Sequence, residues 1–454
     1  MLRMLLISHH EMMLKQMQKS DLFGRQQFVL TIPPELAACQ LQRRPAMTVV
    51  TSGKTVQCHR CHTISQQRDV ALCDGQFYCP ACLQLGRIDS RGELISLPEP
   101  NQFQVRPPLL TWSGQLTPQQ QQVSQAILTG FQHQQQRLVW AVTGAGKTEM
   151  LFEGLAWALT QGWRVAIAAP RIDVCLELMP RLQAAFQKTP ILLLYGGQTE
   201  AYRYTQFMLC TTHQLLRFYH AFDVLVIDEV DAFPYARNAV LQVATQQALK
   251  PTGRRLYLTA TPSAALKHQV QVGQLQLSYL PRRYHGHPLA QPRVWVTPGW
   301  QRQLVRQRLT WRLKQLLQQK IQRQQAFLLF VPRIALLAPL AACLKQLAPH
   351  LRFETVHAAD PQREAKILAM RQQRYQALIT TTILERGVTF ANIDVIVLGA
   401  DDPVFTTAAL VQMAGRTGRK AAYPEGQVDV MVQGYNRSIK AACRQIRQMN
   451  RACR

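Results

Sequence analysis

The segment Ala141 to Thr148, AVTGAGKT, has the composition and spacing of a phosphate-binding loop, with Ala141 in place of the usual first glycine. An apolar run, RLVWA, precedes it and a helical pattern, EMLFEGLAWALTQG, follows it, as such a loop requires. Glycines let the backbone wrap around an anion, which the N–H groups at the start of the helix then bind. Lys147 would reach the β- and γ-phosphates of ATP, and the Thr148 hydroxyl would bind Mg²⁺. The expected nucleotide-binding residues here are Thr143, Gly144, Ala145, Gly146, Lys147, Thr148 and Glu149.

A second apolar run, VLVIDEVDAF at residues 224–233, ends in acidic residues. Carboxylates at the C-terminal end of a buried parallel strand lie at the edge where open α/β sheets bind ligands. Asp228 is expected to hold Mg²⁺, and Glu229 to act as the base that orients the attacking water. Together with Lys147, these two carboxylates predict NTP binding and hydrolysis.

Two more segments predict how hydrolysis is linked to movement. In LTATP, at 258–262, the hydroxyls of Thr259 and Thr261 are expected to hydrogen-bond the carboxylates of DEVD. In QMAGRTGR, which begins at Gln412, the guanidinium groups of Arg416 and Arg419 lie about one helical turn apart. A planar, permanently charged group suits the charge on a transferring phosphate, so we expect both arginines to be catalytic. Gln412, at the start of the same segment, is also expected to be catalytic. If these residues come from a second unit, hydrolysis depends on closing the cleft between the units.

Four cysteines form two C-x-x-C pairs, Cys58/Cys61 and Cys79/Cys82, separated by the 17 residues at positions 62–78. This spacing is typical of a zinc ribbon, in which four soft thiolates surround one Zn²⁺ ion. A redox role is disfavoured because no βαβ pattern surrounds the pairs. Cys73, His59 and His62 are alternative ligands, and contact of this basic module with DNA is left open. Cys175, Cys210 and Cys343 are expected to be core residues.

The 454 residues are 47% hydrophobic, which excludes global disorder and allows about three domains. Only 17% of residues are charged, against roughly 25% in an average protein, yet the formal net charge is +26. A shortage of acids, rather than a basic tail, therefore produces the charge, and the balance favours a polyanionic partner. Residues 1–19 do not form a convincing secretory signal, and the longest apolar stretch contains Arg333 and two prolines, so we expect a cytoplasmic protein.

Short β-branched runs alternate with helical stretches twice along the chain, which predicts an α/β fold with parallel sheets and crossover helices. The expected division is an N-terminal segment (1–57), a zinc-binding module (58–98), a first α/β domain (111–285) and a second (300–454). Residues 96–110 and 285–300 are interpreted as linkers because prolines are frequent there and periodicity is weak. One long polar helix is expected over residues 301–325.

The ordered set LTPQQ, AVTGAGKTEM, APR, DEVD, TATP, TTTILERGVT and QMAGRTGR, over residues 111–435, resembles superfamily 2 helicases of the DEAH-box type. AVTGAGKTEM, DEVDAFPY and TTTILERGVTF together more specifically resemble the late-competence DNA-uptake ATPase (ComFA) family. The resemblance implies two RecA-like P-loop domains that use ATP to move single-stranded DNA inward during natural transformation.

The same resemblance implies further site residues. Gln120 corresponds to an adenine-reading glutamine, since its amide offers a donor and an acceptor. Gly387 is expected in a tight turn close to both ATP and nucleic acid; many relatives carry an acid two residues later, where this chain has Thr389, so no acid acts there. The expected DNA-binding residues, which would contact phosphates and so read no sequence, are Pro170, Arg171, Thr211, Thr212, Thr380, Thr381 and Thr382.

Partners and alternatives also follow from the resemblance. Expected partners are single-stranded DNA, the companion late-competence phosphoribosyltransferase-like protein and the membrane DNA-uptake channel, at the inner face of the membrane; an oligomer is allowed. A PriA-like replication-restart helicase is the first alternative, but that class places its zinc sites inside the helicase core, whereas these cysteines precede it. An RNA helicase is the second alternative. A non-enzymatic scaffold would predict a damaged Lys147, Glu229 or Arg416, and all three are intact.

Overall fold

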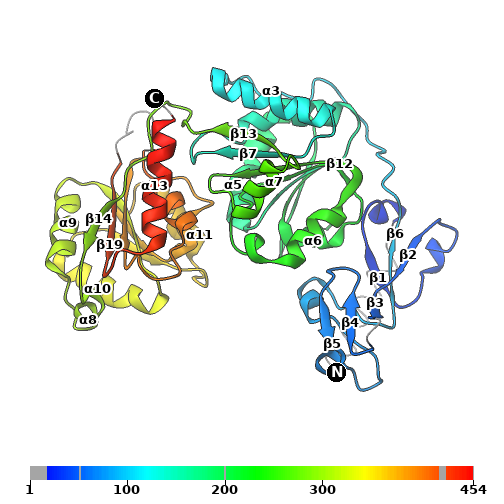
Figure 1. Cartoon of the computed structure of the whole chain (residues 1–454), viewed down its shortest axis with the longest axis horizontal. Helices are drawn as coiled ribbons and strands as arrows, with labels where there is room; N and C mark the ends of the chain where they lie inside the picture. Colours follow the sequence, from blue (N-terminus) through cyan, green and yellow to red (C-terminus); the bar gives the residue numbers. More distant parts are fainter. Residues whose placement is uncertain (1–17, 51–52, 199–200, 419–425, 453–454) are drawn as a thin grey trace.

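The computed structural model of the chain describes residues 18–50, 53–198, 201–418 and 426–452. Most of the N-terminal stretch assessed above as a secretory signal, and Arg419, lie outside these ranges. Figure 1 shows two α/β lobes side by side, with a smaller blue module against the far side of the first lobe. Two lobes, each built on a parallel sheet, were expected from the sequence, and the structure confirms this fold.

The first lobe contains a seven-stranded parallel sheet with the order β13-β7-β12-β11-β8-β10-β9. Its strands are β7 (Arg137–Ala141), β8 (Val165–Ala169), β9 (Ile191–Leu194), β10 (Phe207–Thr211), β11 (Phe222–Ile227), β12 (Leu249–Thr259) and β13 (Gln276–Leu280). The α-helices of this lobe are α3 (Pro118–Gln132), α4 (Phe152–Thr160), α5 (Ile172–Ala185), α6 (Ala239–Ala248) and α7 (Ala264–Gln271), with short 3₁₀ turns η4 (Glu149–Leu151), η5 (Thr212–Arg217) and η6 (Tyr235–Arg237). Every residue of β8, β10 and β11 is buried, as expected of strands that are almost entirely apolar and covered on both faces.

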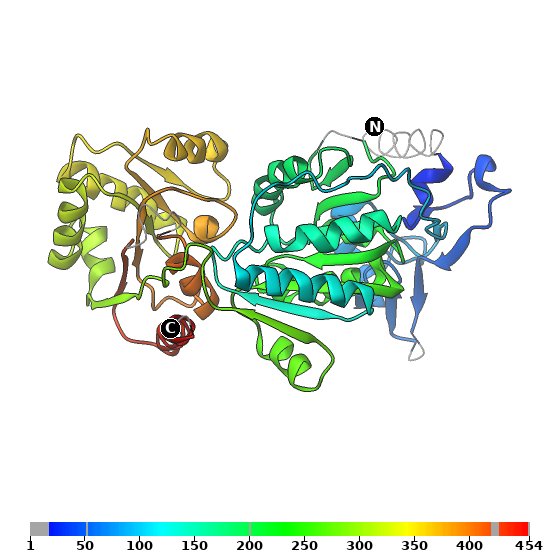
Figure 2. The ribbon, with the colours of Figure 1, turned by 90° about the horizontal axis from the view of Figure 1, so that it is seen from above.

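The second lobe contains a six-stranded parallel sheet with the order β14-β19-β18-β15-β17-β16. Its strands are β14 (Arg293–Val296), β15 (Ala326–Phe330), β16 (Phe353–Val356), β17 (Ala377–Thr380), β18 (Ile393–Leu398) and β19 (Val428–Val432). Its helices are α8 (Trp300–Val305), α9 (Trp311–Gln322), α10 (Leu337–Leu347), α11 (Arg363–Arg371), α12 (Thr407–Ala414) and α13 (Arg437–Arg451), with 3₁₀ turns η7 (Ile334–Leu336) and η8 (Thr382–Glu385). The view from above separates the two lobes and shows the chain crossing between them (Figure 2).

Two predictions about the region between the lobes were wrong. The segment 285–300 is not only a linker, because β14 within it pairs in parallel with β19 at the edge of the second sheet. The single helix expected over residues 301–325 is two helices, α8 and α9. Gln307 adopts a left-handed backbone (φ 54°) between them, and the hydroxyl of Thr310 caps α9 by accepting from the N–H of Leu313.

The N-terminal module contains two three-stranded antiparallel sheets. One has the order β1-β6-β2, from β1 (Gln27–Val29), β6 (Glu93–Ser96) and β2 (Gln42–Pro45). The other has the order β3-β4-β5, from β3 (Met47–Val49), β4 (Thr55–Cys58) and β5 (Ile64–Gln66). Short helical turns complete the module: η1 (Lys19–Leu22), η2 (Pro34–Leu36), α2 (Gln67–Val70) and η3 (Pro80–Leu85). The boundary expected after residue 57 therefore falls inside β4, because the segment before it supplies strands to both sheets.

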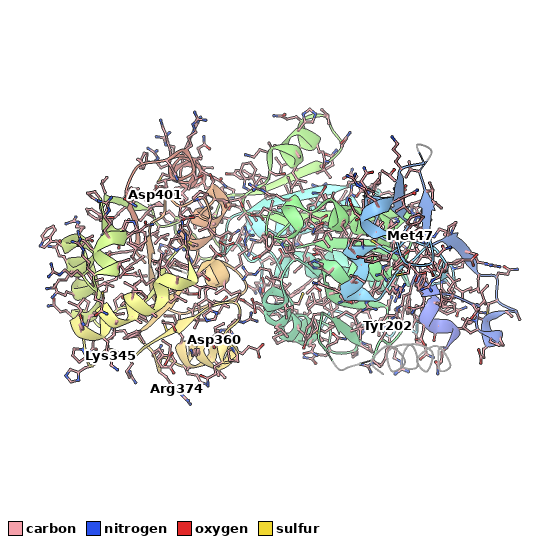
Figure 3. The ribbon with its side chains drawn as sticks, turned by 90° about the horizontal axis from the view of Figure 1, so that it is seen from below. Met47, Tyr202, Lys345, Asp360, Arg374 and Asp401 are labelled. Atoms are coloured by element: carbon pink, nitrogen blue, oxygen red, sulfur yellow. The ribbon has the colours of Figure 1, made fainter. Side chains whose placement is uncertain are left out.

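The module is attached to the first lobe by buried polar contacts. Arg164 of the first lobe is fully buried and donates to the carbonyl of Phe23 and to Glu99, at 2.9 and 2.7 Å. The guanidinium of Arg25 lies over the ring of Tyr202, 4.2 Å from its centroid; Figure 3 labels Tyr202 near the module's Met47. The module thus packs against the first lobe, on the side away from the second.

Candidate nucleotide site between the two lobes

The phosphate loop connects β7 to η4, as the sequence predicted. Gly144 and Gly146 adopt left-handed backbone conformations, with φ of +84° and +72°. A Cβ at position 146 would also lie 2.5 Å from the Nε2 atom of Gln120, so the amide of Gln120 would have to move. The Nζ atom of Lys147 lies 3.5 Å from the carbonyl oxygen of Ala141, inside the loop. The loop therefore requires glycine where a bound anion requires exposed N–H groups.

Gln120 holds the phosphate loop from the start of α3. Its Oε1 accepts from the N–H of Thr117 at 2.8 Å and its Nε2 donates to the carbonyl of Ala145 at 2.8 Å. Thr117 completes a capping box by accepting from the N–H of Gln120. A primary amide has two N–H groups and two lone pairs, so these bonds leave one of each for a base edge.

Asp228 and Glu229 follow β11 directly. Burial raises the pKa of Asp228 to about 6; the charge of Glu229 adds to this shift and the charge of Lys147 opposes it. Glu229 has φ of +50°, an uncommon backbone for a non-glycine residue, which turns its side chain away from that of Asp228. Asp228 and Thr148 are both buried and offer hard oxygen ligands, so this donor set fits Mg²⁺.

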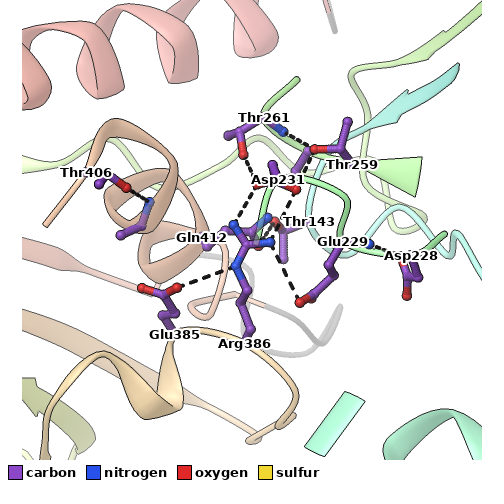
Figure 4. Close-up of polar contacts among 12 residues, drawn as sticks. Thr143, Asp228, Glu229, Asp231, Thr259, Thr261, Glu385, Arg386, Thr406 and Gln412 are labelled. Atoms are coloured by element: carbon purple, nitrogen blue, oxygen red, sulfur yellow. Dashed lines mark hydrogen bonds and ion pairs between the residues drawn. The ribbon is translucent and has the colours of Figure 1, made fainter. Parts of the chain in front are cut away.

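The last carboxylate of DEVD, Asp231, lies at the centre of a hydrogen-bond network (Figure 4). Thr259 donates its hydroxyl to Asp231 at 2.6 Å, and Thr261 donates to the other carboxylate oxygen, so the expected contact between TATP and DEVD is confirmed. Arg386 of the second lobe donates to both oxygens of Asp231, at 2.6 and 3.3 Å. Burial opposes the charge of Asp231, but Arg386 and the two hydroxyls hold the pKa of this carboxyl below its usual value.

Arg386 also faces the two other acidic residues of the site. Its guanidinium lies 3.7 Å from the Oε2 atom of Glu229 and 3.5 Å from Glu385. Burial lowers the pKa of Arg386, but Asp231, Glu229 and Glu385 outweigh burial and raise it. Within the described part of the chain, Oε2 of Glu229 is buried and accepts no hydrogen bond. The expected base therefore has an oxygen that accepts no hydrogen bond from the described residues and lies 3.7 Å from an arginine of the other lobe.

The QMAGRTGR segment contacts the phosphate loop directly. The hydroxyl of Thr143 donates to Oε1 of Gln412 at 2.9 Å, so Gln412, which the sequence analysis placed among the catalytic residues, contacts the phosphate loop of the first lobe. A Cβ at Gly415 would lie 2.5 Å from Cβ of Thr143, so the two backbones approach closely. The guanidinium of Arg416 donates to the carbonyls of Glu385 and Val388 in its own lobe. In this structure Arg416 therefore holds the loop that carries Arg386.

Gly387 lies at the contact between the lobes. Its φ is +69°, and a Cβ there would lie 2.8 Å from Cβ of Asp173, in the first turn of α5. The neighbouring Arg171 donates across the same contact to the carbonyl of Ile383, at 2.8 Å. Glu149, also expected to bind nucleotide, makes an ion pair with Arg181 on α5.

The other residues expected to bind DNA lie where the sheets end. Pro170 follows β8, Thr211 ends β10 and Thr212 begins η5. Thr381 and Thr382 are half-buried beyond β17. The structure does not bring Thr380 to a surface: it is fully buried and donates to the carbonyl of Val356 at 2.9 Å. Its hydroxyl is used inside the second lobe.

The four cysteines of the module converge as the spacing predicted. Their sulfur atoms all lie within 4.8 Å of one another, and the pairs Cys58/Cys82 and Cys61/Cys79 are 3.8 and 3.5 Å apart. A tetrahedral zinc ion with Zn–S bonds of about 2.3 Å needs sulfur atoms about 3.8 Å apart, so the cluster fits zinc. The buried Arg60 donates to the sulfur of Cys82 at 3.3 Å, which favours a thiolate there.

Sequence reasoning missed Arg386 and did not assign a role to Asp231 separately. Their signals were present, since Asp231 is the last letter of DEVD and Arg386 precedes Gly387 in LERGVT. The pairing itself joins residues that are 155 positions apart, and no local pattern reports it.

Comparisons with known proteins agree with this arrangement. A family model described as "Type III restriction enzyme, res subunit" matches residues 113–264, and one described as "Helicase conserved C-terminal domain" matches residues 310–421. The fold is similar to Mss116p bound to ssRNA and AMP-PNP (TM-score 0.56, 16% identity, 70% of this chain and 69% of that one). It is also similar to the Mycobacterium smegmatis helicase Lhr bound to ssDNA and AMP-PNP (TM-score 0.54, 18% identity, 75% and 48%).

Two curated relatives are much more similar in sequence. Competence protein ComFA of Bacillus subtilis (strain 168) is 43% identical over 375 residues, covering 83% of this chain and 81% of that protein. Competence protein ComFA of Streptococcus pneumoniae (strain ATCC BAA-255 / R6) is 40% identical over 399 residues, covering 87% and 90%. With both helicase models matched in order, the protein is an ATP-hydrolysing enzyme of the superfamily 2 helicase type. The chain belongs to the ComFA family of competence proteins.

Proposed function

We propose that this protein is an ATP-dependent translocase of single-stranded DNA that drives DNA import during natural transformation. The observation that carries the proposal is the contact of Arg386 with Asp231 and Glu229, because it makes the hydrolytic residues of one lobe depend on the position of the other. Each turnover would then be linked to a movement of the lobes. The two ComFA relatives support the role in competence.

In the proposed reaction, the phosphate loop and Lys147 bind the triphosphate, and Thr148 and Asp228 would hold a Mg²⁺ ion, whose charge would offset that of the phosphates. Glu229 accepts a proton from the attacking water through its unbonded Oε2 atom. Arg416 acts as a positioning residue in the arrangement described, while Arg419 is the candidate for stabilising charge on the transferring phosphate.

The proposed path of the DNA crosses the carboxyl ends of both sheets, past Arg171 in the first lobe and Thr381 and Thr382 in the second. Contacts of these types bind phosphates and read no sequence. Thr211 and Thr212 lie at the same end of the first sheet but are buried, at 5% and 0% exposed, so like Thr380 they do not reach a surface. The net charge of +26 supports a polyanionic partner.

RNA is the second candidate substrate, because the solved structures of similar fold include one bound to ssRNA and one bound to ssDNA. A PriA-like role is less well supported, since the four-cysteine cluster lies in the N-terminal module rather than within the helicase core. The proposed DNA preference therefore rests on the ComFA relatives and not on the fold.

The ATPase rate measured side by side with single-stranded DNA, duplex DNA and RNA tests the proposal. We expect the largest stimulation by single-stranded DNA of any sequence. If the path neutralises about five phosphates, affinity should fall ~10²-fold between about 50 and 200 mM salt, because neutralisation releases counterions. Stimulation by RNA alone, or an affinity that does not change with salt, would contradict the proposal.

We also propose that the module binds one structural Zn²⁺ through Cys58, Cys61, Cys79 and Cys82. Removal of the metal by a chelator, or the change Cys61→Ser, should make residues 58–86 sensitive to protease, because so small a module lacks a sufficient core of its own. Basal ATPase activity should be retained, since the module packs on the far side of the first lobe. Metal analysis and limited proteolysis check this, with the exposed Cys73→Ser as the control that keeps its zinc. Wild-type protein with far less than one zinc per chain would rule the site out.

The proposed partners are the companion late-competence phosphoribosyltransferase-like protein and the membrane DNA-uptake channel, with the protein acting at the inner face of the membrane. Among the described residues, none of the helices combines the length and apolar character needed to cross a bilayer. The proposed contact with the channel is peripheral. Co-purification of each partner with the full chain, with and without single-stranded DNA, tests these contacts.

A further inference from the structure

A cavity of about 370 Å³ lies beside the phosphate loop. One wall is the start of α3, from Thr117 to Gln120, and the other is the chain that leaves β13 toward the second lobe, from Leu280 to Gly286. Its volume is within the range of small-molecule sites, which is roughly 300–1,000 Å³. No motif in the sequence covers residues 282–286, which are named the connecting segment below.

The connecting segment is attached to the phosphate loop. The N–H of Tyr284 donates to the carbonyl of Gly144 at 3.2 Å. The side chain of the buried Arg283 passes 3.8 Å from where a Cβ of Gly144 would lie. Gln120, on the opposite wall, donates to the carbonyl of Ala145 in the same loop. The cavity therefore opens where the base and sugar of a nucleotide would lie if its phosphates are on the loop.

The chemistry of the two walls suits a planar heterocycle. Gln120 keeps one N–H and one lone pair for a base edge. Tyr284 is 49% exposed, and its ring lies edge-to-face with that of His285, their centroids 5.0 Å apart. An exposed aromatic face that lines a cavity of this size can stack on a base of any identity.

We infer that Tyr284 forms the stacking wall of the nucleobase pocket, so that the connecting segment recognises the base while Gln120 reads its edge. The inference rests on the proposed ATP turnover and adds a residue that none of the helicase motifs contains.

The connecting segment also contacts the second lobe. Arg283 donates to the carbonyl of Gly418 at 2.6 Å, and Nε2 of His285 lies 2.9 Å from the same oxygen. Gly418 belongs to QMAGRTGR, the segment whose Gln412 bonds to Thr143. Tyr284 is thus flanked in the sequence by Arg283 and His285, the two residues that contact the second lobe.

The test measures KM for ATP and kcat of the full chain without nucleic acid, for wild type, Tyr284→Ala and Tyr284→Phe. The alanine variant should raise KM roughly tenfold while kcat changes little, and phenylalanine should restore KM because stacking needs only the ring. Inhibition by inorganic tripolyphosphate, which has no base, should be the same in all three proteins. Tyr435→Ala, which removes an exposed tyrosine of the second lobe, is the control.

An unchanged KM in Tyr284→Ala would overturn the inference. Equal weakening of ATP and tripolyphosphate would also overturn it, because Tyr284 would then only shape the phosphate loop. A wild-type protein that does not turn over ATP, or whose turnover ignores single-stranded DNA, would contradict the proposed function instead, so the two failures are distinguishable.

Discussion

Replacing Glu229 with glutamine should slow ATP turnover by about 10²–10⁴-fold while ATP still binds, because the amide cannot accept the proton of the attacking water. Oε2 of Glu229 is buried, accepts no hydrogen bond from the described residues and lies 3.7 Å from Arg386. Glutamine has the same shape, so the phosphate loop and Asp228, the proposed Mg²⁺ ligand, should be undisturbed. Steady-state ATPase rates with saturating single-stranded DNA, together with equilibrium binding of ATP, measure both effects.

A matched control is Glu364→Gln, an exposed glutamate on α11. This variant loses the same charge outside the site and should keep the wild-type rate. If Glu229→Gln turns over ATP normally, the assignment of the base is wrong. If it loses ATP binding as well, Glu229 maintains the shape of the site rather than its chemistry.

The second large effect is expected from breaking the contact between Arg386 and Asp231. Arg386 is 1% exposed and donates to both oxygens of Asp231. Arg386→Met would therefore leave the negative charges of three neighbouring acidic residues without the positive charge that now offsets them. Removing one partner of such a pair typically costs about 3–5 kcal/mol. Much of this cost should appear as separation of the lobes, because the pair joins one lobe to the other. kcat should therefore fall strongly while each lobe stays folded.

A double-mutant cycle separates this effect from general damage. Asp231→Asn and Arg386→Met should each lower kcat, and the double variant should be no worse than the worse single variant, because both remove one interaction. Lobe separation can be followed by X-ray scattering or by fluorescence transfer between labels on α7 and α9. Arg363→Met is the control: its pair with Asp173 also crosses the lobes at 2.9 Å but is more exposed, so its effect should be small. Additive losses in the cycle would show that the pair does not couple the lobes.

The sequence predicted those parts of the molecule that local patterns determine. β11 and β18 are apolar apart from one aspartate each near the start, a pattern typical of strands buried on both faces, and the structure places them inside their sheets. Gly144 and Gly146 indicated the shape of the phosphate loop, because few other residues adopt its backbone. The cysteine spacing likewise indicated a cluster that the structure brings together.

The wrong or missing parts depend on contacts that no short window contains. β14 is four residues long, lies near prolines and is a strand only because β19 lies beside it. The break between α8 and α9 has no proline or glycine to mark it; Gln307 adopts the left-handed backbone instead. The partners of Arg386 and the connecting segment come together only when two lobes meet, so composition and periodicity could not reveal them.

Gly387 shows how closely the two lobes must approach each other. Because glycine has no side chain, the first turn of α5 can pack against it: a Cβ at position 387 would lie only 2.8 Å from the Cβ of Asp173. An alanine at position 387 would strain its own turn. It would leave the core of each lobe intact, but its methyl group would push the two lobes apart. Such a variant would keep every catalytic side chain but would hydrolyse ATP poorly, because the side chains of the two lobes would be held too far apart to act together.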